Sequence, residues 1–267
     1  MTIVKTRVLV GMEIHVELAT NSKMFTSAPN LAIPAHYEAE PNTLVDPLVM
    51  ALPGSLPVIN KRAVAMSMRV GLALNCTISK FTKWDRKNYY YPDLPKGYQI
   101  SQFDKPLCVG GVIEIEVDNC IKPIGITRAH LEEDTGKLGH ELPGGGQYKG
   151  SLVDLNRAGT PLLEIVSEPD MCSADEAVAY GRAIRDICRY LGVTEGIMQR
   201  GHMRFEPNIN VIITTEDGEE FATPIAEIKN LNSFKALHGA ITYEEVRQVS
   251  AWKKDGKVMG PNAKSTR

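Results

Sequence analysis

In the stretch Gly11-Met12-Glu13-Ile14-His15-Val16-Glu17-Leu18, polar and apolar residues alternate one by one. Successive side chains of a β-strand point to opposite faces, so the pattern predicts a strand over residues 7–18 with one buried and one ionisable face. The ionisable face carries Glu13, His15 and Glu17. A solvated surface strand would show the same alternation, so this stretch alone leaves a structural and a functional interpretation open.

The rest of the chain continues in the same way. A helix over 174–191 is indicated by an apolar stripe behind a capping box of Ser173 and Glu176, and Gly192 ends it. Because strands predominate and no strand–helix–strand rhythm is present, we expect an α+β fold with a largely antiparallel sheet and flanking helices. The other expected elements are helices over 60–75 and 233–248, strands over 203–213 and 220–230, and a hairpin of 112–118 with 121–133 through Asp118-Asn119.

Composition describes an ordinary globular chain. The 267 residues are 43% hydrophobic and 23% charged, with a formal net charge of −2. A protein that binds nucleic acid through its whole surface is usually far more basic, so we expect no DNA partner. The five cysteines form no C-x-x-C pair, which favours free thiols in a reducing compartment. No signal peptide or membrane-spanning run is evident, and we expect a cytoplasmic protein with no membrane partner.

Metal-binding residue types recur on the other expected strands. Arg204, Glu206 and Asn208 share one face of the strand over 203–213, and Glu227 and Lys229 share a face of the next. Carboxylates and amide oxygens on a sheet face are the ligands that hard cations such as Mg²⁺ require, with phosphates and waters completing the octahedron. This repetition favours the functional interpretation of residues 11–18.

Three consecutive carboxylates stand at Glu132, Glu133 and Asp134. They repel one another unless solvent or a cation offsets their charge. In a strand Glu132 and Glu133 point to opposite faces, so both serve one site only if the strand ends or bulges at Thr135-Gly136. A charged loop is the alternative.

Two other segments have open interpretations. Basic residues and tyrosines over 84–93, with Lys87 among them, suit stacking on bases and contact with phosphate, or equally a tyrosine core beside a solvated turn. Arg157, in a polar turn between two expected strands, suits a phosphoryl oxygen or a neighbouring carboxylate. The glycines at 144–146 are expected in a turn, because they lack the helix and the lysine of a P-loop.

Five segments, at 11–18, 85–93, 98–102, 130–137 and 155–164, occur in order and together resemble the B subunit of the aspartyl/glutamyl-tRNA amidotransferase. The resemblance runs from about residue 7 to the last residue. It implies that residues 1–267 form a catalytic cradle domain with a glutamine-synthetase-like sheet, incomplete at its C-terminus. The helical and tail domains that hold tRNA would then be absent.

The same resemblance implies a reaction and partners. ATP would phosphorylate the side-chain carboxylate of mischarged Glu-tRNA(Gln) or Asp-tRNA(Asn), and ammonia would displace the phosphate to form the amide. Ammonia would arrive through a tunnel from the glutaminase, which is the A subunit, while the C subunit would hold the other two together. The sequence does not indicate which mischarged tRNA is the substrate.

Site residues also follow from the resemblance. Glu13 and Glu133 match the ligands of a structural Mg²⁺, and Lys87 falls on the ammonia path. A second, catalytic divalent site would be formed by His15, Glu132, Glu206 and Glu227. Alongside these we expect catalytic contributions from Arg157 and the acidic ligands Glu132, Glu206 and Glu227, and ATP binding by Arg204 and Asn208.

Some positions depart from the family pattern. Thr26-Ser27-Ala28 and Asp46-Pro47-Leu48 stand where some members carry cysteines, so we expect no zinc. Gln199-Arg200 replaces a frequent pair of glutamates, which exchanges two negative charges for one positive charge. Two alternatives to the catalytic subunit stay open: a truncated, catalytically impaired subunit that still docks its partners, and a free-standing ligase that joins a small carboxylate to an amine.

Overall fold

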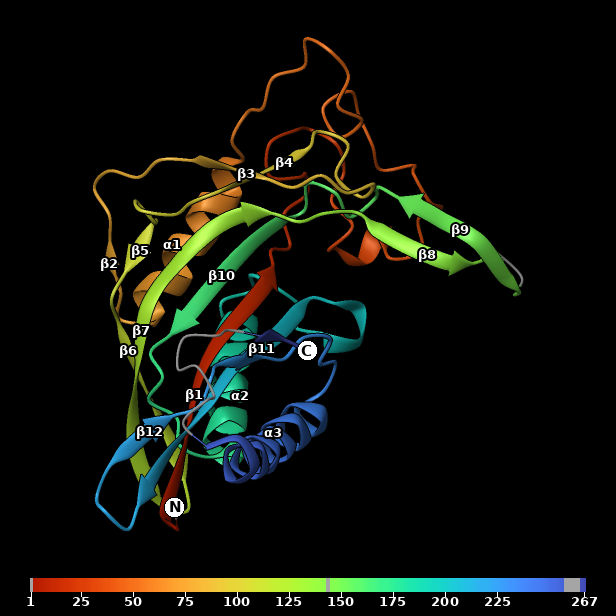
Figure 1. The fold of residues 1–267 in the computed structure, drawn as a ribbon. Helices are drawn as coiled ribbons and strands as arrows, with labels where there is room; N and C mark the ends of the chain where they lie inside the picture. Colours follow the sequence, from red (N-terminus) through yellow and green to blue (C-terminus); the bar gives the residue numbers. More distant parts are fainter. Residues whose placement is uncertain (1, 143–144, 257–264) are drawn as a thin grey trace.

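A curved, mainly antiparallel sheet forms the centre of the molecule (Figure 1). The computed structural model describes residues 2–142, 145–256 and 265–267. The strand order is β14-β13-β11-β1-β10-β7-β5-β2, with β12 beside β11 and β6 beside β7. The central strands are β1 (Ile3–Glu17), β7 (Cys120–Glu133), β10 (Pro161–Ser167) and β11 (Met203–Thr215). Every pairing is antiparallel except that of β13 (Ala226–Glu227) with β14 (Ser265–Thr266).

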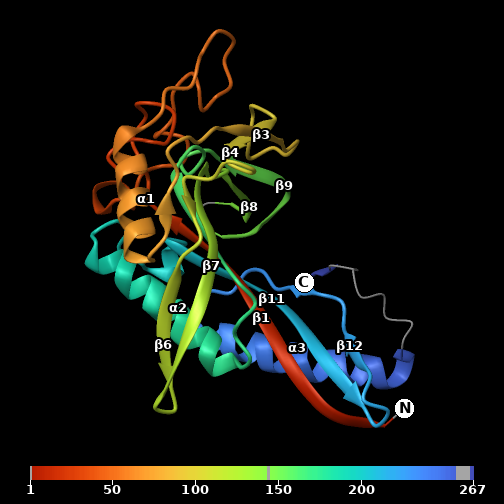
Figure 2. The ribbon, with the colours of Figure 1, turned by 90° about the vertical axis from the view of Figure 1, so that its left-hand side faces the viewer.

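One face of this sheet is apolar and carries the helices. Met12, Ile14 and Val16 are each at most 1% exposed and belong to the same cluster as the buried residues of all three helices. Figure 2 shows the helices along one side of the curved sheet. They are α1 (Lys61–Ala73), α2 (Ala174–Tyr190) and α3 (Phe234–Asp255). Burial of this face is the main stabilising contribution, and it leaves the opposite face of β1 for polar groups.

The helix starts follow the capping signals in the sequence. The side chain of Ser173 accepts a hydrogen bond from Glu176 N, and Asn60 accepts from the backbone N–H groups of Arg62 and Ala63. These bonds satisfy N–H groups that have no partner inside the helix. The predicted α+β class and the three helices are therefore confirmed, although α3 extends to Asp255 rather than ending near residue 248.

The strands agree with the alternation in the sequence, with one exception. The β6 (Val112–Val117) and β7 hairpin turns at Asp118 and Asn119, which both have positive φ, as a tight two-residue hairpin requires. The expected strand over 220–230 is instead divided into β12 (Glu220–Ala222) and β13, because Thr223-Pro224-Ile225 interrupts it. The expected turn at 144–146 falls partly on residues 143–144, which lie outside the described residues.

The remaining elements gather at the end of the sheet where β1 and β7 finish (Figure 1). They comprise the long segment between β1 and α1 with η1 (Pro34–His36), the hairpin of β3 (Asp85–Asn88) with β4 (Tyr98–Ser101), and the hairpin of β8 (Lys137–Glu141) with β9 (Gln147–Asp154). Short β2 (Thr77–Ile78) pairs with β5 (Cys108–Val109), and η2 (Met198–Arg200) precedes β11. This end of the molecule supplies side chains above the polar face of the sheet.

Candidate metal centre

The register of four strands brings ionisable side chains together on the polar face of the sheet. Glu13 of β1 stands opposite Glu206 of β11, and His15 stands opposite Glu164 of β10. Glu164 in turn stands opposite His130 of β7. Directly paired residues of antiparallel strands project from the same face, so one surface collects groups that lie far apart in the sequence.

Glu13, Glu206 and Glu227 form the first group, which we call the glutamate group. One carboxylate oxygen from each lies within 4.8 Å of the others. Asn208 Nδ2 donates a hydrogen bond of 2.8 Å to Glu13 Oε1. Lys229 Nζ lies 3.1 Å from Glu227 Oε1 and also donates to Glu206 Oε2. Lys229 therefore offsets part of the negative charge, and its ammonium lies where it also competes with a cation.

His15, Glu132 and Glu164 form the second group, the histidine group, by the same 4.8 Å criterion. His15 Nε2 lies 3.6 Å from Glu132 Oε1 and 3.5 Å from Glu164 Oε2. Its other ring nitrogen, Nδ1, lies 3.9 Å from Glu206 Oε1 and is buried without a hydrogen-bond partner among the described residues. His15 thus stands between the two groups, and the unpaired nitrogen beside a carboxylate fits a divalent cation.

The electrostatics of the histidine group show how strongly its members depend on one another. Burial raises the pKa of Glu132, and the charge of Glu164 raises it further. Burial also disfavours the ionised form of Glu164, but hydrogen bonds from His130 and His15 outweigh it and hold the pKa of Glu164 far below its ordinary value. Burial alone would lower the pKa of His15, yet these carboxylates raise it overall. A bound cation would offset the same repulsion between carboxylates.

Glu133 does not join either group. It continues strand β7 opposite Pro161, one residue after Glu132, so its side chain lies on the other face of the sheet. There it is 2% exposed, accepts a 3.0 Å hydrogen bond from Ile100 N and pairs with Lys96. Among the described residues, the groupings therefore differ from those implied by the resemblance: Glu13 lies with Glu206 and Glu227 rather than with Glu133.

Glu164 is the member that the sequence analysis did not single out as a ligand. It is flanked by Leu163 and Ile165, both fully buried, and it is the only charged residue of strand β10. Its single charge within an otherwise uncharged strand was the signal in the sequence that could have identified Glu164 as a candidate ligand. Its partner His130 is 4% exposed, places Nε2 3.3 Å from Glu164 Oε2, and has a buried Nδ1 without a hydrogen-bond partner among the described residues.

A cavity of about 470 Å³ opens onto these groups. Glu13, Glu132, Glu164 and His130 line it from the sheet, and Lys87 lines it from β3. The β3–β4 hairpin also contributes Asp85, Arg86 and Ser101 to the lining. Lys87 therefore lines the same cavity as the acidic residues, and its place on an ammonia path stays a prediction.

Arg204 and Arg157 converge on Asp134, just beyond the end of β7. Arg204 Nη2 donates a 2.6 Å hydrogen bond to Asp134 Oδ2, and Arg157 Nε lies 3.6 Å from the same oxygen. Burial opposes ionisation of Asp134, but the two guanidinium groups outweigh it and lower its pKa. Arg157 also donates to the carbonyls of Thr135 and Gly136, at 3.0 and 2.6 Å. The arginines therefore fix the loop that follows Glu133.

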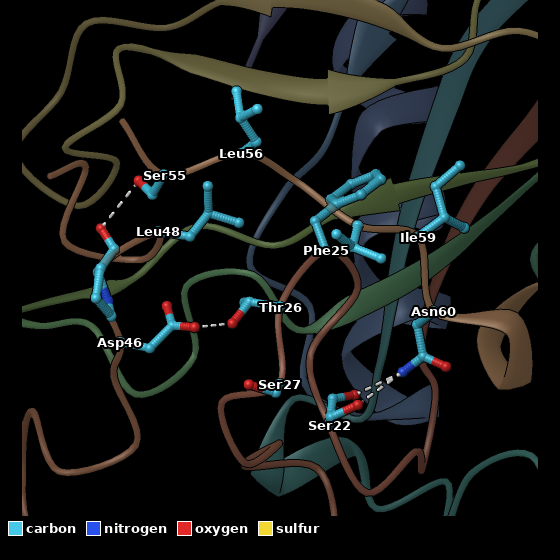
Figure 3. A pocket seen from close by; sticks show the side chains of 12 residues that line it. Ser22, Phe25, Thr26, Ser27, Asp46, Leu48, Ser55, Leu56, Ile59 and Asn60 are labelled. Atoms are coloured by element: carbon cyan, nitrogen blue, oxygen red, sulfur yellow. Dashed lines mark hydrogen bonds between the residues drawn. The ribbon is translucent and has the colours of Figure 1, made fainter. Parts of the chain in front are cut away.

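A separate cavity of about 470 Å³ is lined in part by Thr26, Ser27, Asp46 and Leu48, residues from the two segments on which the expected absence of zinc rests (Figure 3). Thr26 Oγ1 donates to Asp46 Oδ2, and Phe25 and Leu48 contribute apolar walls. Its lining contains neither cysteine nor histidine, the residues that most often bind zinc. The expected absence of zinc stays a prediction.

Comparison with known proteins identifies the family. The pattern of the GatB/GatE catalytic domain matches residues 8–267. The chain belongs to this family. Proteins named as the B subunit of aspartyl/glutamyl-tRNA(Asn/Gln) amidotransferase are 49% identical in Geotalea uraniireducens, over 98% of this chain and 54% of the relative, and 53% identical in Listeria monocytogenes serotype 4b (strain CLIP80459), over 93% and 49%. One from Rhodopirellula baltica is 48% identical, over 97% and 51%.

The chain spans about half the length of these curated relatives. The predicted resemblance to the B subunit is confirmed over nearly the whole chain. None of the helices in the described residues is long and apolar enough to cross a membrane.

Proposed function

We propose that this chain is the catalytic portion of the B subunit of a tRNA-dependent amidotransferase. In this proposal it uses ATP and Mg²⁺ to activate the side-chain carboxylate of Glu-tRNA(Gln) or Asp-tRNA(Asn) for amidation. Ammonia from the glutaminase, the A subunit, completes the reaction, the C subunit holds the assembly together, and the protein acts in the cytoplasm. The observation that carries the proposal is the pair of acidic groups joined by His15 on one face of the sheet.

The ligand set suits Mg²⁺ at both groups. Glu13, Glu206 and Glu227 offer three carboxylates, and Glu132 and Glu164 offer two more beside His15. Mg²⁺ usually keeps several waters and takes its remaining ligands from carboxylates and substrate phosphates. When bound, such ions neutralise the charge that develops on a transferring phosphoryl group. Glu133, which the resemblance implies as a ligand, belongs to neither group in this proposal, because it pairs with Lys96 away from them.

The surrounding residues position and neutralise the reactants. Arg204 lies opposite His15 in the sheet, close enough for its charge to affect that imidazole, and Arg157 lies beside it through Asp134. Both supply positive charge next to the acidic groups, as binding of a nucleotide's phosphates requires. Asn208 orients Glu13 through its hydrogen bond. Lys87 of β3 lines the same cavity, close enough for its charge to affect Glu132, and suits an incoming nucleophile or a carboxylate substrate.

The proposal is tested by amide formation on tRNA. The chain is combined with its glutaminase partner and the C subunit, and formation of Gln-tRNA(Gln) or Asn-tRNA(Asn) is measured with ATP, Mg²⁺ and glutamine. We expect ATP turnover to rise when mischarged tRNA is added. The Glu164→Gln variant should lose this ATP turnover. The control Glu114→Gln, which changes an exposed carboxylate on β6, should keep it.

Three results would contradict the proposal in different ways. Partner binding without any ATP turnover would indicate a docking subunit. ATP turnover that depends on a small carboxylate and not on tRNA would indicate a free-standing ligase. Equal activity of Glu164→Gln and Glu114→Gln would remove the histidine group from the reaction.

A further inference from the structure

A second polar cavity, of about 430 Å³, has Arg157 and Arg204 in its lining and none of the members of the glutamate and histidine groups. We call it the basic pocket, because its charged lining residues are mostly positive. They are Lys137, Arg157, Arg200 and Arg204, with Asp154 as the one carboxylate among them. The excess of positive charge predicts an anionic ligand, and it contrasts with the cavity above the sheet, whose lining includes Glu13, Glu132 and Glu164.

The arginines of the basic pocket retain hydrogen-bond donors for a ligand. A guanidinium has five N–H donors in a planar fork. Arg204 uses its terminal nitrogens on Asp134, while its Nε is buried without a hydrogen-bond partner among the described residues. Arg157 uses Nε and Nη2 on backbone carbonyls. Each arginine therefore has donors left, and each is already held in place by the protein.

Arg200 is placed at the pocket by two contacts on its other side. Its guanidinium carbon lies 4.4 Å from the ring centroid of Tyr37, and Nη2 lies 3.1 Å from Glu38 Oε1. The side chain of Glu38 is 87% exposed, so this ion pair is weak and readily exchanged for a stronger anion. The cation–π contact with Tyr37 restrains the guanidinium and reduces the entropy lost when it binds a ligand.

Uncharged donors complete the lining. The side-chain amides of Gln199, Asn230 and Asn232 border the same cavity. Amides bind ribose hydroxyls and phosphate oxygens without adding charge, whereas arginine binds phosphate oxygens in a bidentate manner. The combination favours a phosphate that is attached to a sugar over a simple carboxylate.

We propose that the basic pocket is a phosphate-binding site, with Arg200 as a ligand contact that no other part of the proposed reaction uses. The proposed function, on which this part of the inference rests, offers two sources of such a phosphate. They are the nucleotide and the backbone of the RNA substrate. The shared chemistry is recognition of a sugar-linked phosphate group by Arg200 and Lys137 in addition to Arg157 and Arg204.

Binding to the chain is measured by fluorescence anisotropy with two labelled probes, ADP and an RNA hairpin with a single-stranded 3′ end, in buffer containing EDTA. We expect Arg200→Ala and Lys137→Ala each to weaken binding of at least one probe about tenfold, or about 1.4 kcal/mol. Both side chains are exposed, so folding should be unaffected. The control Arg69→Ala removes an exposed arginine on α1 and should leave binding unchanged.

The probe that responds identifies the source. An effect on ADP alone assigns the pocket to the nucleotide, and an effect on the hairpin alone assigns it to RNA. For RNA, Arg200→Ala should also reduce the slope of log affinity against log salt by about 1, as expected for one lost phosphate contact. Failure of both probes to bind, or equal affinity of wild type, Arg200→Ala and Lys137→Ala for both, would overturn the proposal.

The outcome is separable from that of the proposed function. Because EDTA removes divalent ions, binding here does not depend on the acidic groups or on catalysis. A chain that binds Mg²⁺ and amidates tRNA but shows no effect of Arg200→Ala would refute the basic pocket alone. A chain that shows the effect of Arg200→Ala but no amidation would refute the proposed function alone.

Discussion

Lys23 has no exposed surface, although its side chain ends in an ammonium group. Nζ donates one hydrogen bond, of 3.2 Å, to the carbonyl of Leu155, and the aliphatic part of the side chain packs beneath Gly159. Burial lowers the pKa of Lys23 from 10.5 to about 8, and the carboxylates Asp46 and Asp154 offset only part of the effect. Lys23 therefore supports the loop that carries Arg157, at a cost in stability while it is charged.

The magnitude and the sign follow from this pKa. Between about pH 8 and 10.5 the unfolded chain holds a proton on Lys23 that the folded chain has lost, so the stability due to this residue rises with pH over that range. The fall from 10.5 to about 8 corresponds to about 3 kcal/mol. Below pH 8 both states are protonated, and the full cost is present.

Lys23→Met replaces the side chain by an apolar one of similar length and removes this cost. The lost hydrogen bond to Leu155 offsets the gain by about 1.5–3 kcal/mol, so the variant should be as stable as wild type or slightly more stable at about pH 7. Between about pH 7 and pH 10.5 the unfolding free energy of wild type should then rise by about 3 kcal/mol relative to that of Lys23→Met. Urea unfolding followed by fluorescence of the buried Trp252 measures both values.

The control for this experiment is Lys253→Met, which changes an exposed lysine on α3 and should show a difference that is constant with pH. All other titrating groups are shared by wild type and variant, so they cancel in the difference. A Lys23→Met difference that is constant with pH, or one that moves in favour of the variant as the pH rises, would show that burial does not lower the pKa of Lys23.

Three further substitutions test a packing contact, a helix cap and a buried ion pair. For each, the unfolding free energy in urea is compared with that of wild type. Gly71→Ala should destabilise by about 1–3 kcal/mol, because its Cβ would clash with Sγ of Cys108, and Gly239→Ala, with open space around it on α3, should not. Asn60→Ala should cost about 1–2 kcal/mol through loss of the cap of α1. Asp134→Asn should cost about 3–5 kcal/mol, because it removes the carboxylate that pairs with Arg204. The difference in unfolding free energy between wild type and this variant should shrink as the pH falls below 3.8, because the wild-type carboxyl of Asp134 then loses its contribution. A difference that does not change with pH would contradict the lowered pKa of Asp134.

Local patterns predict the sheet and its helices because the deciding interactions are local. The alternation around Glu13 and His15 requires one buried and one polar face whatever the neighbouring strands are. Ser173 and Asn60 satisfy N–H groups only two or three residues away. These features need no knowledge of the tertiary structure, and the structure confirms them.

The composition of the two acidic groups depends instead on register between distant strands. Glu164 is brought beside His15 by the β1–β10 pairing, across 149 positions of sequence, and no local pattern encodes that pairing. Glu133 shows the converse case, since it follows Glu132 in sequence but is turned to the other face, where Lys96 neutralises it. The path of the irregular segment between β1 and α1 could not be predicted either, because some of the contacts that fix it, such as those of Asn30 with Leu18 and Thr160, join residues far apart in the sequence.

Calorimetric titration of the chain with Mn²⁺, which takes the same oxygen ligands as Mg²⁺, shows directly whether the two acidic groups bind metal ions. The proposal predicts two bound ions, loss of one in Glu13→Gln and of the other in Glu164→Gln, and no loss in Glu133→Gln. Each variant's fold is checked by its far-ultraviolet circular dichroism. Undiminished binding in both Glu13→Gln and Glu164→Gln, or loss of an ion in folded Glu133→Gln, would contradict the two groups as the structure arranges them.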